Sequence, residues 1–135
     1  MFPKIHSVAI VLIGSLFFMA ADASAELEQA QSNIISLVKE GNYAQAQVQT
    51  QGLIADFSGN PALPETLYLI AEEYYWARRL EEANNLYQQI IKDHPDSSFA
   101  SKAKLGIARA EATSLILSKN YDRDKDVLDE LVTDF

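Results

Sequence analysis

The sequence has no cysteine, which excludes a disulfide, a thiolate nucleophile and a cysteine zinc site. Glycine and proline are scarce, at 5 and 4 residues, and Gln, Ala, Glu and Leu recur instead. This composition favours helix over strand. Basic residues are the minority, because 11 Lys and Arg stand against 19 Asp and Glu and leave a net charge of −8. Phosphate and anionic lipids attract cations, so this charge argues against binding to nucleic acid or to an anionic membrane surface.

The first 25 residues have the organisation of a secretory signal peptide. A short basic start precedes a nearly continuous apolar run from Val8 to Ala20. That run is about 13 residues long, shorter than the roughly 20 that a helix needs to span a bilayer. The small-x-small site Ala23-Ser24-Ala25 follows it, so we expect cleavage and a mature chain that begins at Glu26 without a membrane anchor. An uncleaved anchor is the alternative.

We therefore predict two segments, a signal peptide at residues 1–25 and a helical repeat domain at residues 26–135. The second segment is long enough for one modest core. A lipoprotein would need a cysteine at the cleavage point, and the chain has none. We expect the mature protein in the periplasm, with full secretion as the alternative.

An apolar pattern recurs three times along the mature chain, at residues 53–57, 90–94 and 131–135. Each copy has two apolar residues, any residue, Asp, and then an aromatic residue or His. Repeats at a spacing of 20–50 residues are typical of stacked helical units. Further columns match ten and seven residues before the copies: Tyr43, Leu80 and Tyr121, and then Ala46, Ala83 and Asp124.

Each unit has the periodicity of a helix pair. In the second unit, Leu67, Ile70, Ala71 and Tyr74 follow the i, i+3, i+4, i+7 spacing of one buried helical face. Pro95 ends the following helix, because proline cannot donate a backbone hydrogen bond. No segment alternates as a strand does. We predict helices at residues 26–40, 43–57, 63–78, 80–93, 97–118 and 122–134, with turns at Gly41-Asn42, Arg78-Arg79 and Lys119-Asn120.

The second unit resembles a tetratricopeptide repeat, with Arg78 in place of the turn glycine. The third unit departs further, because Asp124 stands where a small Ala should pack, so we expect its second helix to dock loosely. The resemblance implies an all-α fold, a right-handed superhelix of about three helix-turn-helix hairpins. The residues in the apolar, small, aromatic and proline places of the family pattern are Leu67, Ile70, Ala71, Tyr74, Leu80, Ala83, Tyr87, Ile90 and Pro95.

The stretch from His94 to Ala100, followed by an amphipathic helix, is similar to repeats of the bacterial envelope type. Such repeats occur in the periplasmic protein associated with the Tol–Pal system and in the lipoprotein of the outer-membrane assembly machine. The absence of cysteine favours the former kind. The sequence ends at Phe135 without a polar capping helix, so we expect the front part of a longer protein. A short protein with a self-capping acidic last helix is the alternative.

The resemblance implies a non-catalytic scaffold or adaptor that binds a protein or peptide partner in a concave groove and uses no cofactor. Two alternatives remain open: a structural module that self-associates into an oligomer, and the N-terminal interaction domain of a larger enzyme. For Tyr75 and Trp76, exposure in the groove and packing between repeats are equal alternatives. The residues expected to line the groove are Gln31, Lys39, Tyr68, Glu72, Tyr75, Trp76, Arg109 and Thr113.

The sequence predicts no catalytic residue and no metal site. His94 is the only histidine after residue 25, and beside Pro95 at a helix end its expected role is a favourable contact with the helix dipole. The alternating charges at residues 122–126 suggest a calcium loop, but Val127 and Thr133 stand where that loop needs Gly and Glu. We therefore interpret this run as the solvated acidic first turn of the last helix.

Overall fold

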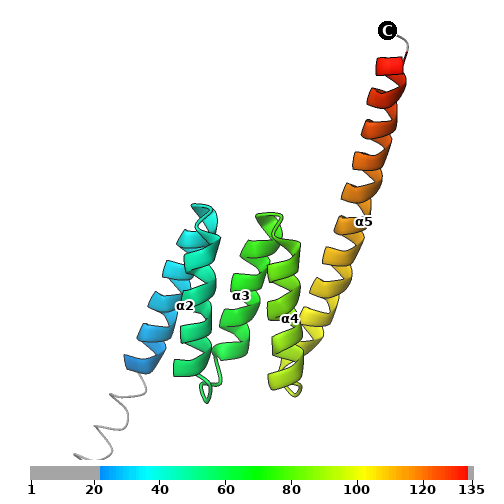
Figure 1. Ribbon diagram of the computed structural model, residues 1–135. Helices are drawn as coiled ribbons and strands as arrows, with labels where there is room; N and C mark the ends of the chain where they lie inside the picture. The colour runs from blue at the N-terminus through cyan, green and yellow to red at the C-terminus, as the bar shows by residue number, and fades with distance from the viewer. Residues whose placement is uncertain (1–21, 134–135) are drawn as a thin grey trace, which may run out of the picture. The chain divides into compact units, whose positions relative to one another are not determined.

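The computed structural model describes residues 22–133, which form helices joined by short turns (Figure 1). No strand occurs among these residues, so the predicted all-α class with helical hairpins is confirmed. The chain divides into two compact units between Thr66 and Leu67, and each unit is described by itself. The helices are residues 22–39, α2 (Tyr43–Asp56), α3 (Leu63–Trp76), α4 (Leu80–Asp93) and α5 (Ser98–Thr133).

The predicted signal peptide lies outside the described residues, apart from residues 22–25, which belong to the first helix. Within residues 22–133, none of the helices combines the length and the apolar character that crossing a membrane requires.

The first unit is a helical hairpin formed by residues 22–39 and α2. Leu27, Ile34 and Val38 are buried at helical spacing on the first helix, and Ala46 and Leu53 are buried on α2. The repeat column that contains Ala46 therefore marks the buried face of this hairpin.

The hairpin of α3 and α4, which belongs to the second unit of the chain, shows the same pattern. Ile70 and Tyr74 of α3 are no more than 1% exposed, and Ala83 and Ile90 of α4 are fully buried. Their spacing places each pair on one face of its helix, so the two apolar faces cover one another. The predicted core positions Ile70, Tyr74, Ala83 and Ile90 are therefore confirmed, whereas Leu80 is only half-buried.

Both hairpin turns use the same backbone device. The amide of Gly41 donates to the carbonyl of Val38 and the amide of Asn42 to that of Leu37, which is the Schellman pattern for a helix end. The amides of Arg78 and Arg79 make the equivalent bonds to Tyr75 and Tyr74. Gly41 has a φ of 78° and Arg78 a φ of 63°, so the arginine occupies a left-handed position that glycine adopts without strain.

Replacing Arg78 with Gly is expected to stabilise the second unit by about 0.5–1 kcal/mol. The substitution removes the contact between the Cβ and the carbonyl in the left-handed conformation, and the greater freedom of glycine in the unfolded chain offsets part of that gain. Urea unfolding followed by circular dichroism measures the difference. Arg79→Gly is the control, because the neighbouring Arg79 does not have a positive φ. This substitution is expected to lower the stability of the second unit.

α5 begins directly after the second hairpin. The Ser97 hydroxyl accepts a hydrogen bond from the backbone amide of Phe99 at 3.2 Å, as expected for a residue that caps this helix. Ala100, Ala103 and Ala110 lie buried along the first half of α5. Because these side chains are small, α5 can lie close to the hairpin before it.

The predicted turn at Lys119-Asn120 was wrong, because α5 is a single helix of 36 residues. The other two hairpins turn at a residue with positive φ, whereas no glycine or proline interrupts residues 107–133. At the repeat position where the two hairpins bury Ala46 and Ala83, the third repeat has Asp124. A last helix that folded back onto α5 would therefore bury a charge. Residues 122–126 therefore lie inside a helix and do not form its first turn.

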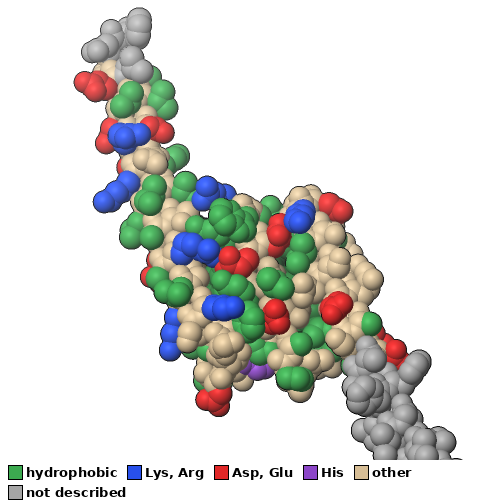
Figure 2. Space-filling model, turned by 180° about the vertical axis from the view of Figure 1, so that it is seen from behind, with side chains coloured by type: hydrophobic (Ala, Val, Ile, Leu, Met, Phe, Trp, Pro, Cys, Tyr) green, Lys and Arg blue, Asp and Glu red, His purple; other side chains and the backbone are tan. Residues whose placement is uncertain are grey.

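The second half of α5 lies outside the core. All side chains from Ser114 to Glu130 are exposed, and α5 continues well past α3 and α4 (Figure 1). Figure 2 shows hydrophobic side chains along this part of α5, mixed with acidic and basic ones. The large hydrophobic residues exposed here are Leu115, Ile116, Leu117, Tyr121, Val127, Leu128 and Val132.

Candidate functional site

A polar network joins the three helices of the second unit around Glu72 of α3. Its Oε1 atom accepts hydrogen bonds from the Tyr87 hydroxyl of α4 and from Nη2 of Arg109 of α5, each at 2.5 Å. Nη2 of Arg109 also donates to the Tyr87 hydroxyl at 3.2 Å. One carboxylate therefore ties α4 and α5 to α3, and two of the predicted groove residues, Glu72 and Arg109, form an ion pair.

Tyr75 belongs to the same contact between α3 and α5. The guanidinium carbon of Arg109 lies 4.0 Å from the centre of the Tyr75 ring, and the Tyr75 hydroxyl lies 3.0 Å from Oγ1 of Thr113. The side chain is only 7% exposed. Of the two alternatives for Tyr75, packing between helices is therefore the one that this geometry favours.

Trp76, the next residue, has the opposite environment. It is 67% exposed at the last position of α3, and its ring and the Tyr75 ring are in T-shaped contact with their centres 5.2 Å apart. The buried Tyr75 thus supports one side of the indole while the rest faces solvent. Trp76 is the predicted aromatic that remains free to contact a partner.

Tyr68 of α3 packs beside this network. Its ring centre is 5.9 Å from that of Tyr87 and 5.6 Å from that of Phe99. A small pocket of about 230 Å³ opens beside it. Two cationic side chains line this pocket with the phenol ring; the lining residues are Tyr68, Lys102, Leu105, Gly106 and Arg109.

Gln31 and Lys39 belong to the first unit, where Gln31 is half-buried and Lys39 is exposed. The second unit brings together Glu72, Tyr75, Arg109 and Thr113 through the contacts given above. A single groove containing all eight residues stays a prediction.

Burial and the Glu72 carboxylate raise the pKa of two phenols in this network. The pKa of Tyr87 lies well above its usual value of 10.0, first because the hydroxyl is buried and then because it donates to Glu72. The pKa of Tyr68 is raised for the same leading reason. Burial works to lower the pKa of Arg109, but its hydrogen bond and charge attraction to Glu72 outweigh this, so the pKa rises. The network therefore holds neutral phenols and a charged guanidinium.

Above about pH 10 we expect the folded second unit to lose stability. An unfolded tyrosine gives up its proton near pH 10 while Tyr87 keeps it in the fold, so rising pH favours the unfolded chain. The loss approaches about 1.4 kcal/mol per pH unit for one such group. Urea unfolding at pH 9 and pH 11 measures it. Tyr87→Phe should show a shallower decline, with Tyr68 accounting for the remainder; identical declines would contradict the assignment.

Two residues that hold the site together were not singled out for it from the sequence. Gly106 of α5 lies under the Tyr87 ring, so closely that an added Cβ would meet Cζ of Tyr87 at 2.6 Å. Tyr87 itself was expected in the core but not in a hydrogen-bond network. A glycine inside a strongly helical stretch was the available signal, because it costs helix stability unless a close approach requires it.

The described residues offer little for metal binding. Across residues 22–133, no group of three or more His, Asp and Glu side chains is placed to hold a metal ion. His94 follows the last residue of α4, and its backbone amide donates to the carbonyl of Ile90 at 2.9 Å. The absence of catalysis stays a prediction.

Comparison with known proteins identifies the second hairpin. Residues 65–97, which cover nearly all of α3 and all of α4, match the family model described as a tetratricopeptide repeat. The match supports a tetratricopeptide repeat protein, and repeats of this family suggest protein–protein interaction. No curated protein and no solved structure matches the chain.

Proposed function

We propose that this chain is an exported, non-catalytic scaffold or adaptor of the bacterial cell envelope that binds a protein or peptide partner through its helical repeats. The tetratricopeptide match at residues 65–97 supports the binding role, because stacked repeats present extended surfaces to partners. The signal-like segment at residues 1–25 supports export to the periplasm, and the absence of cysteine in the chain favours a freely diffusing form over a lipoprotein.

The exposed indole of Trp76 carries the binding proposal. Tryptophan is enriched among residues that dominate binding energy, especially where surrounding groups hold it in place. Tyr75 and Arg109 provide that support, because the tyrosine is fixed by its contacts to α5. A partner that covers Trp76 would bury its ring without ordering a flexible side chain, which lowers the entropic cost of binding.

Trp76→Ala is expected to weaken partner capture by about tenfold or more while leaving helicity unchanged. The bait is the mature chain, residues 26–135, used on a periplasmic extract, with captured protein quantified and the affinity then measured by calorimetry. Val48→Ala removes an equally exposed apolar side chain (68% against 67%) from the first unit and serves as the control. Undiminished capture by Trp76→Ala, or no partner for the unaltered chain, would contradict the proposal.

Export has its own test. The full sequence fused to a reporter enzyme that is active only outside the cytoplasm should give activity, and deletion of residues 1–25 should remove it. N-terminal sequencing should show that the exported protein begins at Glu26. A reporter that stays inactive with the full sequence would refute the envelope location and leave the binding role standing.

Self-association is the second candidate function, favoured by the apolar side chains exposed on the second half of α5. Light scattering on the mature chain separates the two candidates. A monodisperse monomer removes self-association, whereas a dimer that dissociates on Leu128→Asp would support it.

A further inference from the structure

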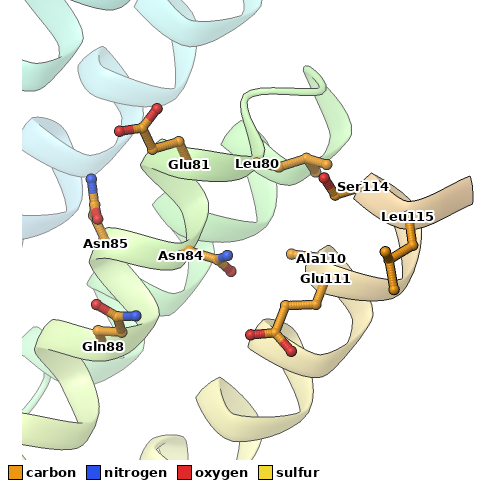
Figure 3. A pocket seen from close by; sticks show the side chains of 9 residues that line it. All are labelled: Leu80, Glu81, Asn84, Asn85, Gln88, Ala110, Glu111, Ser114 and Leu115. Carbon is orange, nitrogen blue, oxygen red and sulfur yellow. The ribbon is translucent and has the colours of Figure 1, made fainter. Parts of the chain in front are cut away.

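α4 and α5 diverge and leave a cleft between them on the second unit. The cleft has a volume of about 640 Å³ and lies away from the Glu72 network, since no residue of that network lines it. Figure 3 shows the side chains of α4 on one side and those of α5 on the other. The lining residues are Leu80, Glu81, Asn84, Asn85, Gln88, Ala110, Glu111, Ser114 and Leu115.

The lining combines apolar contact with groups that accept hydrogen bonds. Leu115 is 63% exposed, and the Leu80 side chain points from α4 toward Ser114 of α5 (Figure 3). The Asn84 side chain points toward α5, and its Oδ1 atom is buried without a hydrogen-bond partner. A buried acceptor in that state favours a ligand that brings a donor, because leaving it unpaired costs about 1–3 kcal/mol.

The charges on the cleft are of one sign. Glu81 and Glu111 are exposed on opposite sides of it, and no Lys, Arg or His is among the lining residues. The adjoining second half of α5 carries both signs with an acidic excess: its exposed charged residues are Asp122, Asp124, Asp126, Asp129 and Glu130 against Lys119, Arg123 and Lys125. A cationic ligand is therefore attracted to the cleft, and an anionic one is repelled.

We propose that the α4–α5 cleft binds an amphipathic helix of a partner protein that carries Lys or Arg beside an apolar stripe. This inference rests on the proposed protein-binding function and assigns it a second surface. The stripe packs against the lining leucines Leu80 and Leu115, the cations pair with Glu81 and Glu111, and a donor pairs with Oδ1 of Asn84.

The same charges disfavour the chain itself as the occupant. The end of α5, folded back, would bring a segment with a net negative charge against Glu81 and Glu111. It would also place Asp124 at the repeat position that Ala46 and Ala83 fill in the two hairpins. A second copy carries the same net charge of −8. Repulsion therefore opposes both, whereas a basic helix gains from each contact.

The absence of cysteine makes a site-specific test direct. Ser114→Cys places one thiol in the cleft, and Ser101→Cys places one on an exposed part of α5 outside it. The probe is a synthetic 16-residue helix with a leucine stripe, flanking lysines and one activated disulfide. We expect fast cross-linking to Ser114→Cys and at least tenfold slower cross-linking to Ser101→Cys. Equal rates would overturn the assignment, and so would Ser114→Cys chains that link to each other in preference to the probe.

Charge variants complete the test on the unlabelled chain. Glu81→Lys combined with Glu111→Lys should weaken anisotropy-measured binding of the lysine probe by at least tenfold. Asp96→Lys, an equal change per site at the exposed α4–α5 turn, should alter it less than twofold. A probe with glutamates in place of lysines should not bind. Equal losses from Asp96→Lys would mean attraction to net charge alone and refute the cleft.

The two proposals fail separately. Trp76→Ala should leave binding of the lysine probe unchanged, because Trp76 does not line the cleft. If the cleft variants have no effect while capture still depends on Trp76, the cleft inference falls and the proposed function stands. If the probe binds but no partner depends on Trp76, the groove assignment falls instead.

Discussion

Replacing Gly106 with Ala is expected to destabilise the second unit by about 1–3 kcal/mol, the usual cost of overpacking a well-filled core. The added Cβ would lie 2.6 Å from Cζ of Tyr87 and 2.8 Å from both Cε atoms. The ring has little room to move, because it is fully buried, packs against Tyr68 and donates its hydroxyl to Glu72. Either the ring or α5 must shift, and a shift breaks contacts in the network.

The sign of the Gly106 effect is the informative part. Glycine in a helix normally destabilises, so Gly→Ala at an open helical position adds about 0.5–1 kcal/mol of stability. Gly52 of α2 is such a position, with nothing within 4 Å of an added Cβ, and Gly52→Ala is the matched control. Urea unfolding of the mature chain measures both. If Gly106→Ala also stabilised, the close approach to Tyr87 would be disproved.

A compensating substitution sharpens this result. Tyr87→Leu makes room above Gly106, so in that background Gly106→Ala should cost little or become favourable. A double-mutant cycle should then give a coupling of about 1 kcal/mol or more, as expected for side chains in direct contact. Independent effects would place the cost of Gly106→Ala elsewhere.

Replacing Tyr87 with Ala should cost about 3–5 kcal/mol, the range for deleting a large buried aromatic side chain. Two losses add together. The deletion opens a cavity against Gly106 and Tyr68, and it removes a hydrogen-bond partner from Glu72 and Arg109. A loss of this size is a large fraction of the total stability of a small domain. The variant should therefore unfold at a temperature far below the unfolding temperature of the unaltered chain.

Tyr87→Phe separates the ring from the hydroxyl. It keeps the buried ring and leaves one acceptor site of Glu72 without a donor, for an expected cost of about 1–2 kcal/mol. Thermal unfolding of the unaltered chain, Tyr87→Ala and Tyr87→Phe, followed by circular dichroism, separates the contribution of ring burial from that of the hydroxyl. A Phe variant as unstable as the Ala variant would show that the hydroxyl network, not ring burial, dominates at this position.

The network has a consequence for binding at the end of α3. Arg109 and Thr113 hold Tyr75, and Tyr75 supports Trp76 from one side. A substitution at Arg109 should therefore loosen the indole without touching a partner directly. The α4–α5 cleft lies outside this chain of contacts, so the two proposed surfaces respond to different substitutions.

Much of the fold was predictable because it depends on residues that are close in sequence. The spacing of Leu67, Ile70 and Tyr74 predicted a buried helical face, and the structure buries all three. Gly41-Asn42 and Arg78-Arg79 were expected at turns, and both turns occur there. Hydrophobic periodicity and turn chemistry are local properties, so the sequence alone carries them.

Three features were decided only by tertiary contacts. Tyr75 and Trp76 are adjacent in sequence, but a helix rotates about 100° per residue, so α5 covers the first and leaves the second in water. Gly106 is explained only by the Tyr87 ring above it. The prediction of a turn at Lys119-Asn120 was wrong although the spacing fitted the repeat. A chain folds back into a hairpin only where the burial of an apolar face offsets the cost of interrupting the helix. Folding back would bury the charge of Asp124, so α5 continues as one helix and leaves the α4–α5 cleft open.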